Sequence, residues 1–357
     1  MQALLRENLA VHELADGIDI SRQTAYRALA ACIDGGLVRS VDSEYALTCS
    51  GGAVLRAYYE TVEVIKRDAF IRLARSRHQP WVLEALDTSP ARKANLARKA
   101  HQEDGSSRAT VHRIVDALLD GDYVVKHAGN YELTGSGRAL LEAYTDFRET
   151  VAQALDKREF LRWLPADIES FPVSALSTST LIQNSPDHPH NVLNALLRVA
   201  DPSLETFEGM ATIVSPTIAQ AYRPVLSGNT RVAGVFPDEV LFGLHKDPEF
   251  IDYVKQQGFT SYIREGFAAR DAELLFVPEL PPIHLAIFDG TRVIISLAPS
   301  TGVTDIEASA IDSTDPQIVE WAKTYFESYH ERGRPPLRTF LDRSLGYTPG
   351  PQHQAGD

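Results

Sequence analysis

Cysteine is nearly absent from this sequence: Cys32 and Cys49 are the only two. Neither stands in a metal-ligand spacing, and two cysteines cannot make a disulfide framework, so the chain is typical of a reducing compartment. Long apolar runs are absent too, and none approaches the roughly 20 residues that cross a bilayer. No signal peptide is visible. We therefore expect a soluble, cytoplasmic protein with no membrane partner.

Lysine is scarce, with 8 residues against 27 arginines, and acidic residues outnumber basic ones to give a formal net charge of −13. This charge excludes an indiscriminate polyanion binder. The preference for arginine is typical of a GC-rich genome or a salt-adapted cytosol. Since 44% of the 357 residues are hydrophobic, the chain can build two or three domains with separate cores.

Motifs for catalysis are missing. The sequence has no Gly-rich phosphate loop, no nucleophile beside a base and no set of metal ligands. His188 and His190 flank Pro189 next to Asp187, but no third ligand stands in register, so we interpret this segment as a loop leading into a helix. We predict a protein that is not an enzyme and that needs no cofactor or metal.

A duplicated stretch dominates the first half of the chain. At an offset of 86 residues, 17 of the 38 positions from 21 to 58 are identical, without a gap. Both copies hold a Ser-Arg-x-Thr-x-x-Arg motif, which starts at Ser21 and at Ser107, then an Asp-Gly pair and a Tyr-x-Leu-Thr motif. This extent of identity indicates two copies of one folding module.

The second copy has the clearest pattern of elements. Helices are expected at 80–90 and 92–100, and Ser107 is the N-cap of a third helix. A two-stranded hairpin at 123–134 and a long helix from about Gly137 follow. Apolar residues at the spacing of one buried helix face support the third helix: Val111, Ile114, Val115 and Leu118.

These motifs resemble the winged helix-turn-helix of archaeal and bacterial regulators, over about 40 residues in each copy. The resemblance implies binding to double-stranded DNA, with the capped helix in the major groove, where arginine can pair with guanine, and the hairpin beside the phosphates. The alternative is that the arginines only solvate a helix face. The implied DNA-contacting residues are Ser107, Arg108, Thr110, His112, Arg113, Lys126 and His127, with Arg22, Gln23 and Arg27 in the first copy.

The two copies differ in charge. Residues 66–113 hold 11 Lys or Arg and 5 Asp or Glu, whereas residues 1–65 hold 5 and 9. The first hairpin also carries Asp42 and Glu44. Because DNA is polyanionic, the second copy is the better candidate for phosphate contacts. Little sequence precedes the first copy, so we expect a shortened module that helps in docking or pairing, or that contacts DNA through its own arginines.

Apolar residues at three- and four-residue spacing predict one helix from Ala53 to Ser76, and the pattern resumes after the second copy. Such stripes join the two modules, form the seam of a homodimer, or pack within their own domain. The sequence leaves these alternatives open.

Strands alternate with helices in the second half, which predicts an α/β domain. Four stretches resemble the effector domain of archaeal regulators in the methanogenesis-regulatory family, in which a doubled winged helix is less common than a single one. The low lysine content suits a haloarchaeal member. The stretches are EFLRWLP at 159–165, ATIVSP at 211–216, IHLAIFDGTRVIISL at 283–297 and STDPQIVEWAKTYFESY at 313–329.

This domain also distantly resembles the phospholipase D-like sensor domain of TrmB-type sugar regulators. Enzymes of that fold use a His-x-Lys motif. Here His284 is followed by Leu-Ala, and His245 directly precedes Lys246, so we predict no phosphodiesterase activity. Because open sheets bind small molecules at strand ends, an effector is expected there. The candidate residues for it are Thr178, Ser179, Ser215 and Thr217.

The sequence thus predicts an α+β, multidomain chain with a first module at 1–64, a second at 65–150, a helical linker at 151–166, an α/β effector domain at 167–332 and a flexible tail at 333–357. We expect a sequence-specific transcription regulator that binds promoter DNA and whose α/β domain senses a small molecule or mediates assembly. The alternative is a winged-helix module for protein–protein interaction without specific DNA binding.

Overall fold

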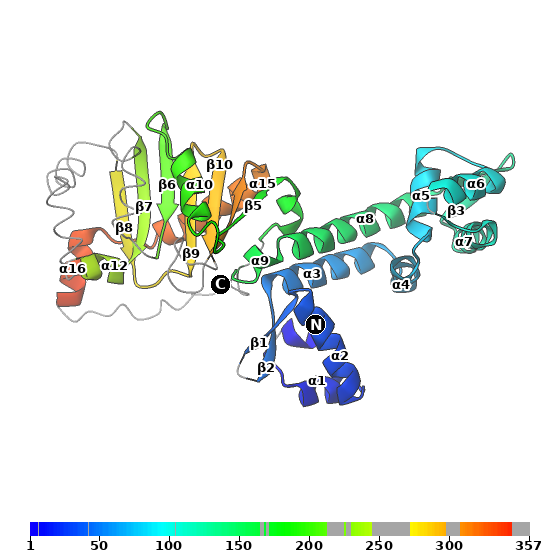
Figure 1. Ribbon diagram of the computed structural model, residues 1–357, viewed down its shortest axis with the longest axis horizontal. Coiled ribbons are helices and arrows are strands. Elements are labelled where there is room, and N and C mark those ends of the chain that lie inside the picture. The colour runs from blue at the N-terminus through cyan, green and yellow to red at the C-terminus, as the bar shows by residue number, and fades with distance from the viewer. Residues whose placement is uncertain are drawn as a thin grey trace, which may run out of the picture. The chain divides into compact units, whose positions relative to one another are not determined.

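The structure is a computed structural model that describes residues 1–344 apart from 6, 42, 104, 165–167, 169–170, 213–224, 226–229, 245–271 and 298–307. It divides into two compact units, Met1–Asp156 and Lys157–Asp357 (Figure 1). The division falls after Asp156 rather than at the predicted 150, because the helix α8, Gly135–Asp156, is continuous across that point.

The first unit contains both copies of the duplicated module. The elements of the first module are η1 Gln2–Leu5, α1 Val11–Gly17, α2 Arg22–Asp34, β1 Val38–Val41, β2 Glu44–Leu47 and α3 Cys49–Val64. Those of the second module are α4 Arg67–Arg75, α5 Gln79–Thr88, α6 Lys93–Glu103, α7 Arg108–Asp120, β3 Val124–His127, β4 Asn130–Leu133 and α8. The order predicted for the second copy is confirmed.

The register of the duplication is kept in three dimensions. The helix α7 has the same length as α2 and begins 86 residues later, and the same offset relates the two hairpins and the starts of α3 and α8. In each module an isolated antiparallel bridge joins a further segment of the chain to the two-stranded hairpin, at Leu9–Tyr45 and at Ala91–Tyr131. The helix α6 is longer than its counterpart α1.

The residues that the two copies share hold the module together. The Ser107 hydroxyl accepts a hydrogen bond from the Thr110 N–H at 3.1 Å, as Ser21 does from Thr24 at 3.2 Å, so both serines cap their helices as predicted. A second shared contact closes the hairpin. The hydroxyl of Thr134, just after β4, donates a hydrogen bond to the carbonyl of Asp122, just before β3, at 2.7 Å. Its counterpart in the first module donates to the Gly36 carbonyl at 2.6 Å.

A glycine in each module lets the last helix start against the hairpin. A Cβ on Gly137 would lie 2.0 Å from the Tyr123 carbonyl oxygen, and a Cβ on Gly51 would lie 2.0 Å from the Leu37 carbonyl oxygen. Only a residue without a side chain fits so close to backbone. This explains why glycine stands at both positions.

The helix predicted from Ala53 to Ser76 is two helices, since the chain is extended at Ile65, with φ −124° and ψ 151°, between α3 and α4. The apolar spacing continues across the break because Ile65, Ala69 and Leu73 are buried in the core of the second module. Apolar residues at helical spacing predict which side chains are buried, but they do not predict whether the helix is continuous.

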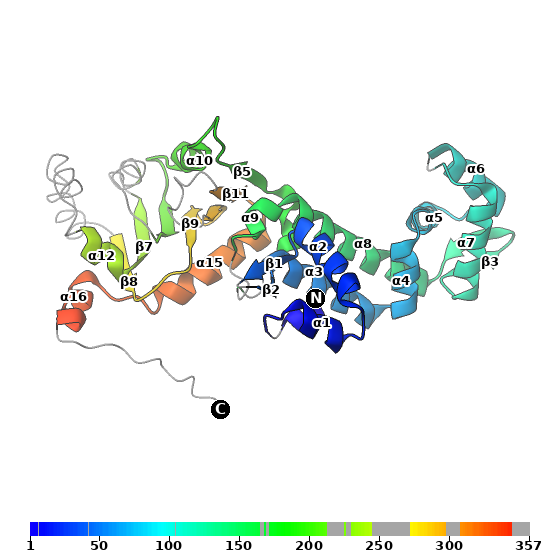
Figure 2. The ribbon, with the colours of Figure 1, turned by 60° about the horizontal axis from the view of Figure 1, so that its bottom comes forward.

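The helices α3 and α8 pack along each other and join the two modules (Figures 1 and 2). The Phe70 ring sits among aromatic rings from both helices, with centroids at 5.4 Å from Tyr58, 6.3 Å from Tyr144 and 5.0 Å from Phe147. These contacts use the apolar stripes within one chain, which favours the joining of modules among the three alternatives. A homodimer stays a prediction.

The second unit is built on a seven-stranded sheet in the order β5-β11-β10-β9-β6-β7-β8, in which β6, β7 and β8 run parallel and the other neighbouring pairs antiparallel. Its described strands are β5 Thr180–Gln183, β6 Thr206–Met210, β7 Arg231–Pro237, β8 Ala272–Val277, β9 Ile283–Phe288, β10 Arg292–Leu297 and β11 Ser309–Ser313. Its described helical elements are α9 Arg158–Leu161, η2 Val173–Thr178, α10 Asn191–Val199, α12 Asp238–Leu244, α15 Pro316–His330 and α16 Pro336–Ser344.

The sheet is covered on both faces, with α10 on one and α15 on the other (Figure 2). Val192 and Leu196 of α10 pack on one face of β9, where Ala286 and Phe288 lie. The intervening strand residues point to the opposite face, because successive side chains of a strand alternate. The mixed helix and sheet content agrees with the predicted α/β domain.

The segment from residue 333, predicted as a flexible tail, contains the helix α16. Arg334 holds its start, because the guanidinium pairs with Asp238 at 2.6 Å and with Asp342 at 3.3 Å. Its backbone also bridges to Phe276 of β8. The prediction rested on composition, which does not register these long-range contacts; residues 345–357 lie outside the described part of the chain.

Gly51→Ala should destabilise the first unit by about 2 kcal/mol, because the new methyl group has to displace the Leu37 backbone. Gly137→Ala should act in the same way in the second module. Chemical denaturation followed by circular dichroism measures both.

Gly52→Ala is the matched control, since nothing lies within 4 Å of a Cβ at this neighbouring helical position. It should be neutral or stabilise the unit by up to about 1 kcal/mol. Equal stability of the Gly51→Ala and Gly52→Ala variants would show that the close approach does not exist.

Candidate functional site

The outer face of α7 carries the predicted cations. Arg108 and Arg113 are exposed, whereas Val111, Ile114, Val115 and Leu118 on the opposite face are buried. Ser107 caps the helix and Thr110 shares a 2.8 Å hydrogen bond with its hydroxyl. The capped helix therefore presents two guanidinium groups to solvent at its N-terminal half.

His112 was predicted to face outward with the arginines, but the structure places it differently. The side chain is half-buried, and its Nε2 atom is shielded from solvent without a hydrogen-bond partner among the described residues. The position lies one residue from the buried Val111, at the margin of the apolar face, and apolar spacing cannot resolve on which side of that margin a ring points. In this arrangement Nε2 is not available to an external group.

The second hairpin presents Lys126 and His127, both exposed on β3. Lys126 Nζ lies 5.7 Å from the centroid of the Tyr131 ring, and Lys93 Nζ lies 5.4 Å from the same centroid. Lys93 also pairs with Asp116 of α7. This ion pair holds α6 to α7 and partly offsets the negative charge of Asp116, which stands three residues after Arg113 on the same helix.

Sequence reasoning missed Lys93 because the pair joins residues 23 positions apart on two helices. The order of elements was the only available signal, since α6 precedes α7 and must pack on it. In the first module, an apolar residue at the start of α1 stands where Lys93 stands in the second module. The ion pair is therefore specific to the second module.

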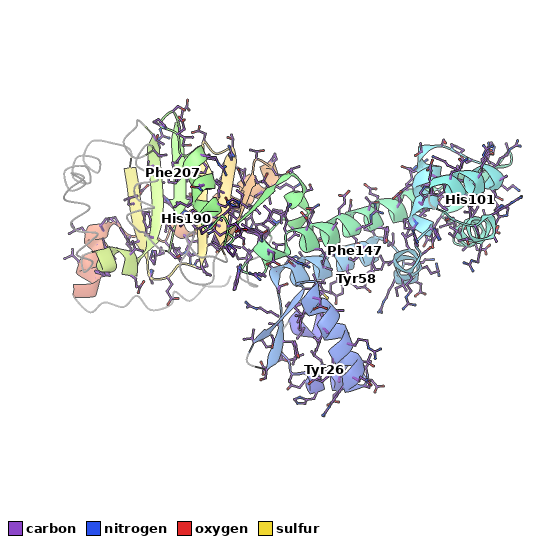
Figure 3. All side chains as sticks on the ribbon, in the orientation of Figure 1. Tyr26, Tyr58, His101, Phe147, His190 and Phe207 are labelled. Atoms are coloured by element: carbon purple, nitrogen blue, oxygen red, sulfur yellow. The ribbon has the colours of Figure 1, made fainter. Side chains whose placement is uncertain are left out.

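In the first module, Arg22, Gln23 and Arg27 are all exposed on α2. Tyr26, which was not a candidate, is 57% exposed on the same helix (Figure 3). It aligns with His112 of the second copy, and that correspondence was the signal in the sequence. Glu44 is exposed on the hairpin, and Asp42 lies outside the described residues.

The ligand site predicted in the second unit stays a prediction, since the structure describes only two of its four residues. The Ser179 hydroxyl is buried and donates to Ser313 at 2.8 Å, while the Thr178 hydroxyl donates to Asp315 at 3.3 Å. Both hydroxyls tie η2 to β11 and to the cap of α15, so they serve the fold. Ser215 and Thr217 lie outside the described residues.

His284 is buried in β9 with 8% exposure, and burial lowers its pKa to about 4. It faces the side of the sheet that α10 covers, beside Ser296 of the neighbouring strand. The described residues hold no group of three or more potential metal ligands. They also hold no helix long and apolar enough to span a membrane.

The family model of the HVO_A0261 N-terminal domain matches the chain twice, at residues 1–70 and 67–156. The duplication in the sequence is thus also a duplication of a known domain. Residues 186–332 match the model of the middle domain of the methanogenesis regulatory protein FilR1, as the sequence resemblance implied. Together these matches fit a regulatory protein.

Three solved structures that match the chain resemble it only remotely. TrmBL2, described as an archaeal chromatin protein with a novel mode of DNA binding, is 14% identical over 72% of this chain and 91% of its own, with a TM-score of 0.30. Two others are 15% identical over 44% of this chain: the phospholipase D family member Nuc from Salmonella typhimurium, with 97% of its chain covered and a TM-score of 0.34, and NucT from Helicobacter pylori, with 98% and 0.33. Likenesses this remote support no conclusion. No curated protein matches the chain significantly.

His284 should make the second unit sensitive to acid. Its pKa is 6.5 when exposed and about 4 when folded, so the unfolded state binds more protons between these values and stability falls as the pH drops from 6.5 towards 4. The slope due to this group approaches about 1.4 kcal/mol per pH unit.

Denaturation of the His284→Gln variant between pH 4 and 7 should give a flatter dependence on pH than that of the natural chain. His190→Gln, which replaces an exposed histidine, should leave the dependence unchanged. The account of His284 fails when the two variants follow the same curve.

Proposed function

We propose that each module of the first unit is a winged helix-turn-helix and that the chain is a sequence-specific, DNA-binding transcription regulator. One observation carries the proposal: both modules present a serine-capped helix whose first turns hold an exposed arginine pair, Arg108 with Arg113 and Arg22 with Arg27, in identical register. The match of the second half to a domain of a regulatory protein, beside two copies of the HVO_A0261 N-terminal domain, supports it.

In this proposal α7 enters the major groove with its N-terminal half. A guanidinium has the fork geometry that pairs with the O6 and N7 atoms of guanine, so Arg108 and Arg113 read bases. Lys126 and His127, exposed on the hairpin, meet the phosphates and fix the register. Lys93 keeps the carboxylate of Asp116 paired and so lowers its repulsion of the duplex.

The two modules divide the work unequally. Residues 66–113 carry an excess of cations and residues 1–65 an excess of anions, so the second module supplies most of the attraction to phosphate. The first module presents Tyr26 beside Arg22 and Arg27, and an exposed ring suits contact with a thymine methyl group. Its contribution is to selectivity more than to affinity.

The second unit has the role of an effector domain, which senses a small molecule or mediates assembly, as its match to a regulatory domain supports. We also infer that it does not hydrolyse phosphodiesters. The buried His284 lacks the lysine two positions on that such chemistry needs, and its position inside the sheet keeps it from a substrate. A cytoplasmic location follows from binding to the chromosome.

A second candidate function is docking to another protein. Ile18, Tyr26 and Ile33 are exposed apolar side chains on α2 or just before it, and exposed apolar groups of this size favour protein contacts. The cations of the second module favour DNA over this alternative. Crosslinking to a protein partner with no enrichment of DNA would select the docking function instead.

Replacing Arg108 and Arg113 together by alanine should lower the affinity for duplex DNA about tenfold or more, because each bidentate contact with a base contributes about 1–3 kcal/mol. The equivalent pair, Arg22→Ala with Arg27→Ala, should lower it less, since the surroundings are acidic. Titration of a labelled duplex at several salt concentrations measures both.

Arg198→Ala, which removes an exposed arginine from α10 in the second unit, is the control and should leave the affinity unchanged. Circular dichroism checks that all variants fold. Unchanged DNA binding in a folded Arg108→Ala, Arg113→Ala variant would reject α7 as the reading helix.

A further inference from the structure

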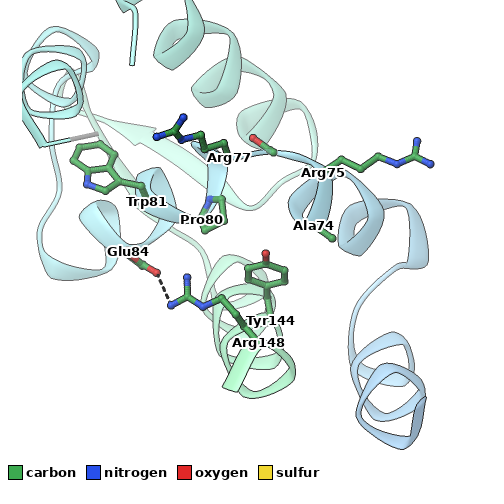
Figure 4. Close-up of a pocket in the computed structure, with 9 residues that line it drawn as sticks. Ala74, Arg75, Arg77, Pro80, Trp81, Glu84, Tyr144 and Arg148 are labelled. Carbon is green, nitrogen blue, oxygen red and sulfur yellow. Dashed lines mark ion pairs between the residues drawn. The ribbon is translucent and has the colours of Figure 1, made fainter. Parts of the chain in front are cut away.

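A cavity of about 570 Å³ lies within the second module of the first unit, beside the long helix α8 (Figure 4). Its walls come from the end of α4 and the following loop, from the first turns of α5, and from the middle of α8. The volume is in the range of pockets that hold small organic molecules.

The lining combines positive charge with aromatic rings. Trp81 and Tyr144 are half-buried in the wall, and Arg77 and Arg148 border the same space, whereas Arg75 points away from it (Figure 4). Among the described residues that line the cavity, Glu84 is the one acidic residue, and its carboxylate lies 3.6 Å from the Arg148 guanidinium.

The charge of this cavity is not balanced from within. Glu84 offsets Arg148, and Arg77 forms no ion pair with any described residue. A guanidinium binds a carboxylate through two parallel hydrogen bonds, and the faces of tryptophan and tyrosine rings pack on planar apolar groups. A ligand that satisfies both kinds of wall carries an acid group on an aromatic ring.

We propose that this cavity binds a small aromatic carboxylate, with its acid group at Arg77 and its ring between Trp81 and Tyr144. Such a ligand touches α5 and α8 at once. Both helices contribute to the core of the second module and α5 also packs on α7, so bound ligand holds α5 in one position against α8 and thereby changes the affinity of α7 for DNA. This last consequence rests on the proposed function, but the binding itself does not.

A DNA phosphate is the competing occupant, because arginines on a rim also attract a duplex. The aromatic wall favours the small acid, since a sugar-phosphate backbone gains little from rings set in a concave surface. Glu84 in the lining also disfavours a polyanion more than a single carboxylate, because repulsion grows with the number of charges.

Isothermal titration of the full chain tests the site, with benzoate and indole-3-acetate as probes and inorganic phosphate as the comparison. At least one aromatic acid should bind saturably with one site per chain, and phosphate should bind more weakly. Arg77→Gln should weaken binding about tenfold or more, as the loss of hydrogen bonds to a charged group implies. Trp81→Leu should weaken it as well.

Arg75→Gln is the matched control, because this arginine stands at the same rim and points away; it should bind the acids as the natural chain does. The proposal is overturned when neither acid binds, or when Arg75→Gln and Arg77→Gln weaken binding equally. It is also overturned when Arg77→Gln lowers the affinity for duplex DNA without any binding of the acids, which would assign the arginine to the DNA backbone.

The consequence for DNA is measured separately. With the acid present, the affinity of the natural chain for a duplex should shift severalfold, and that of Arg77→Gln should not. If the chain binds the acid but no DNA, the ligand site is supported and the proposed function is rejected. If it binds DNA but no acid, the proposed function is supported and the ligand site is rejected.

Discussion

The junction between the hairpin and the last helix of each module is the contact on which the first unit depends. In the second module, the Thr134 hydroxyl and N–H bond to the carbonyls of Asp122 and Tyr123, and Gly137 lets α8 start directly against that backbone. These contacts fix α7, the hairpin and α8 as one body. The first module repeats them at positions 86 residues earlier, which explains why so many of the shared residues are small or hydroxylated.

The junction also determines what the rest of the unit can do. Because α3 and α8 leave their modules in fixed directions, their apolar faces meet and Phe70 fills the space between them. The outer faces of α2 and α7 stay free of that packing, which leaves their arginines in solvent. The cavity with Arg77 and Trp81 lies beside the same helix α8. The surface proposed for DNA and the site proposed for a ligand are therefore both built against α8.

The sequence predicted much of the first unit, because its duplication supplies an internal comparison. The caps at Ser21 and Ser107, the hairpins and the outward arginines follow from short-range patterns, and the structure has all of them. Features that rest on longer-range contacts were missed or misplaced. The break at Ile65 is hidden by continuous burial, and Thr178 and Ser179 are used by partners more than 130 residues away. His112 was misplaced because it lies at the margin of a helix face.

The most direct test of the account is selection of binding sites from a random-sequence duplex library with the full chain. A regulator whose α7 reads bases should enrich a recurrent sequence motif. When the chain is bound, the N7 atoms of guanines in that motif, which lie in the major groove, should be protected from chemical modification. Recovery of no motif, with binding that depends on salt but not on sequence, would contradict the central claim and leave the duplicated module as a surface for phosphates or for a protein partner.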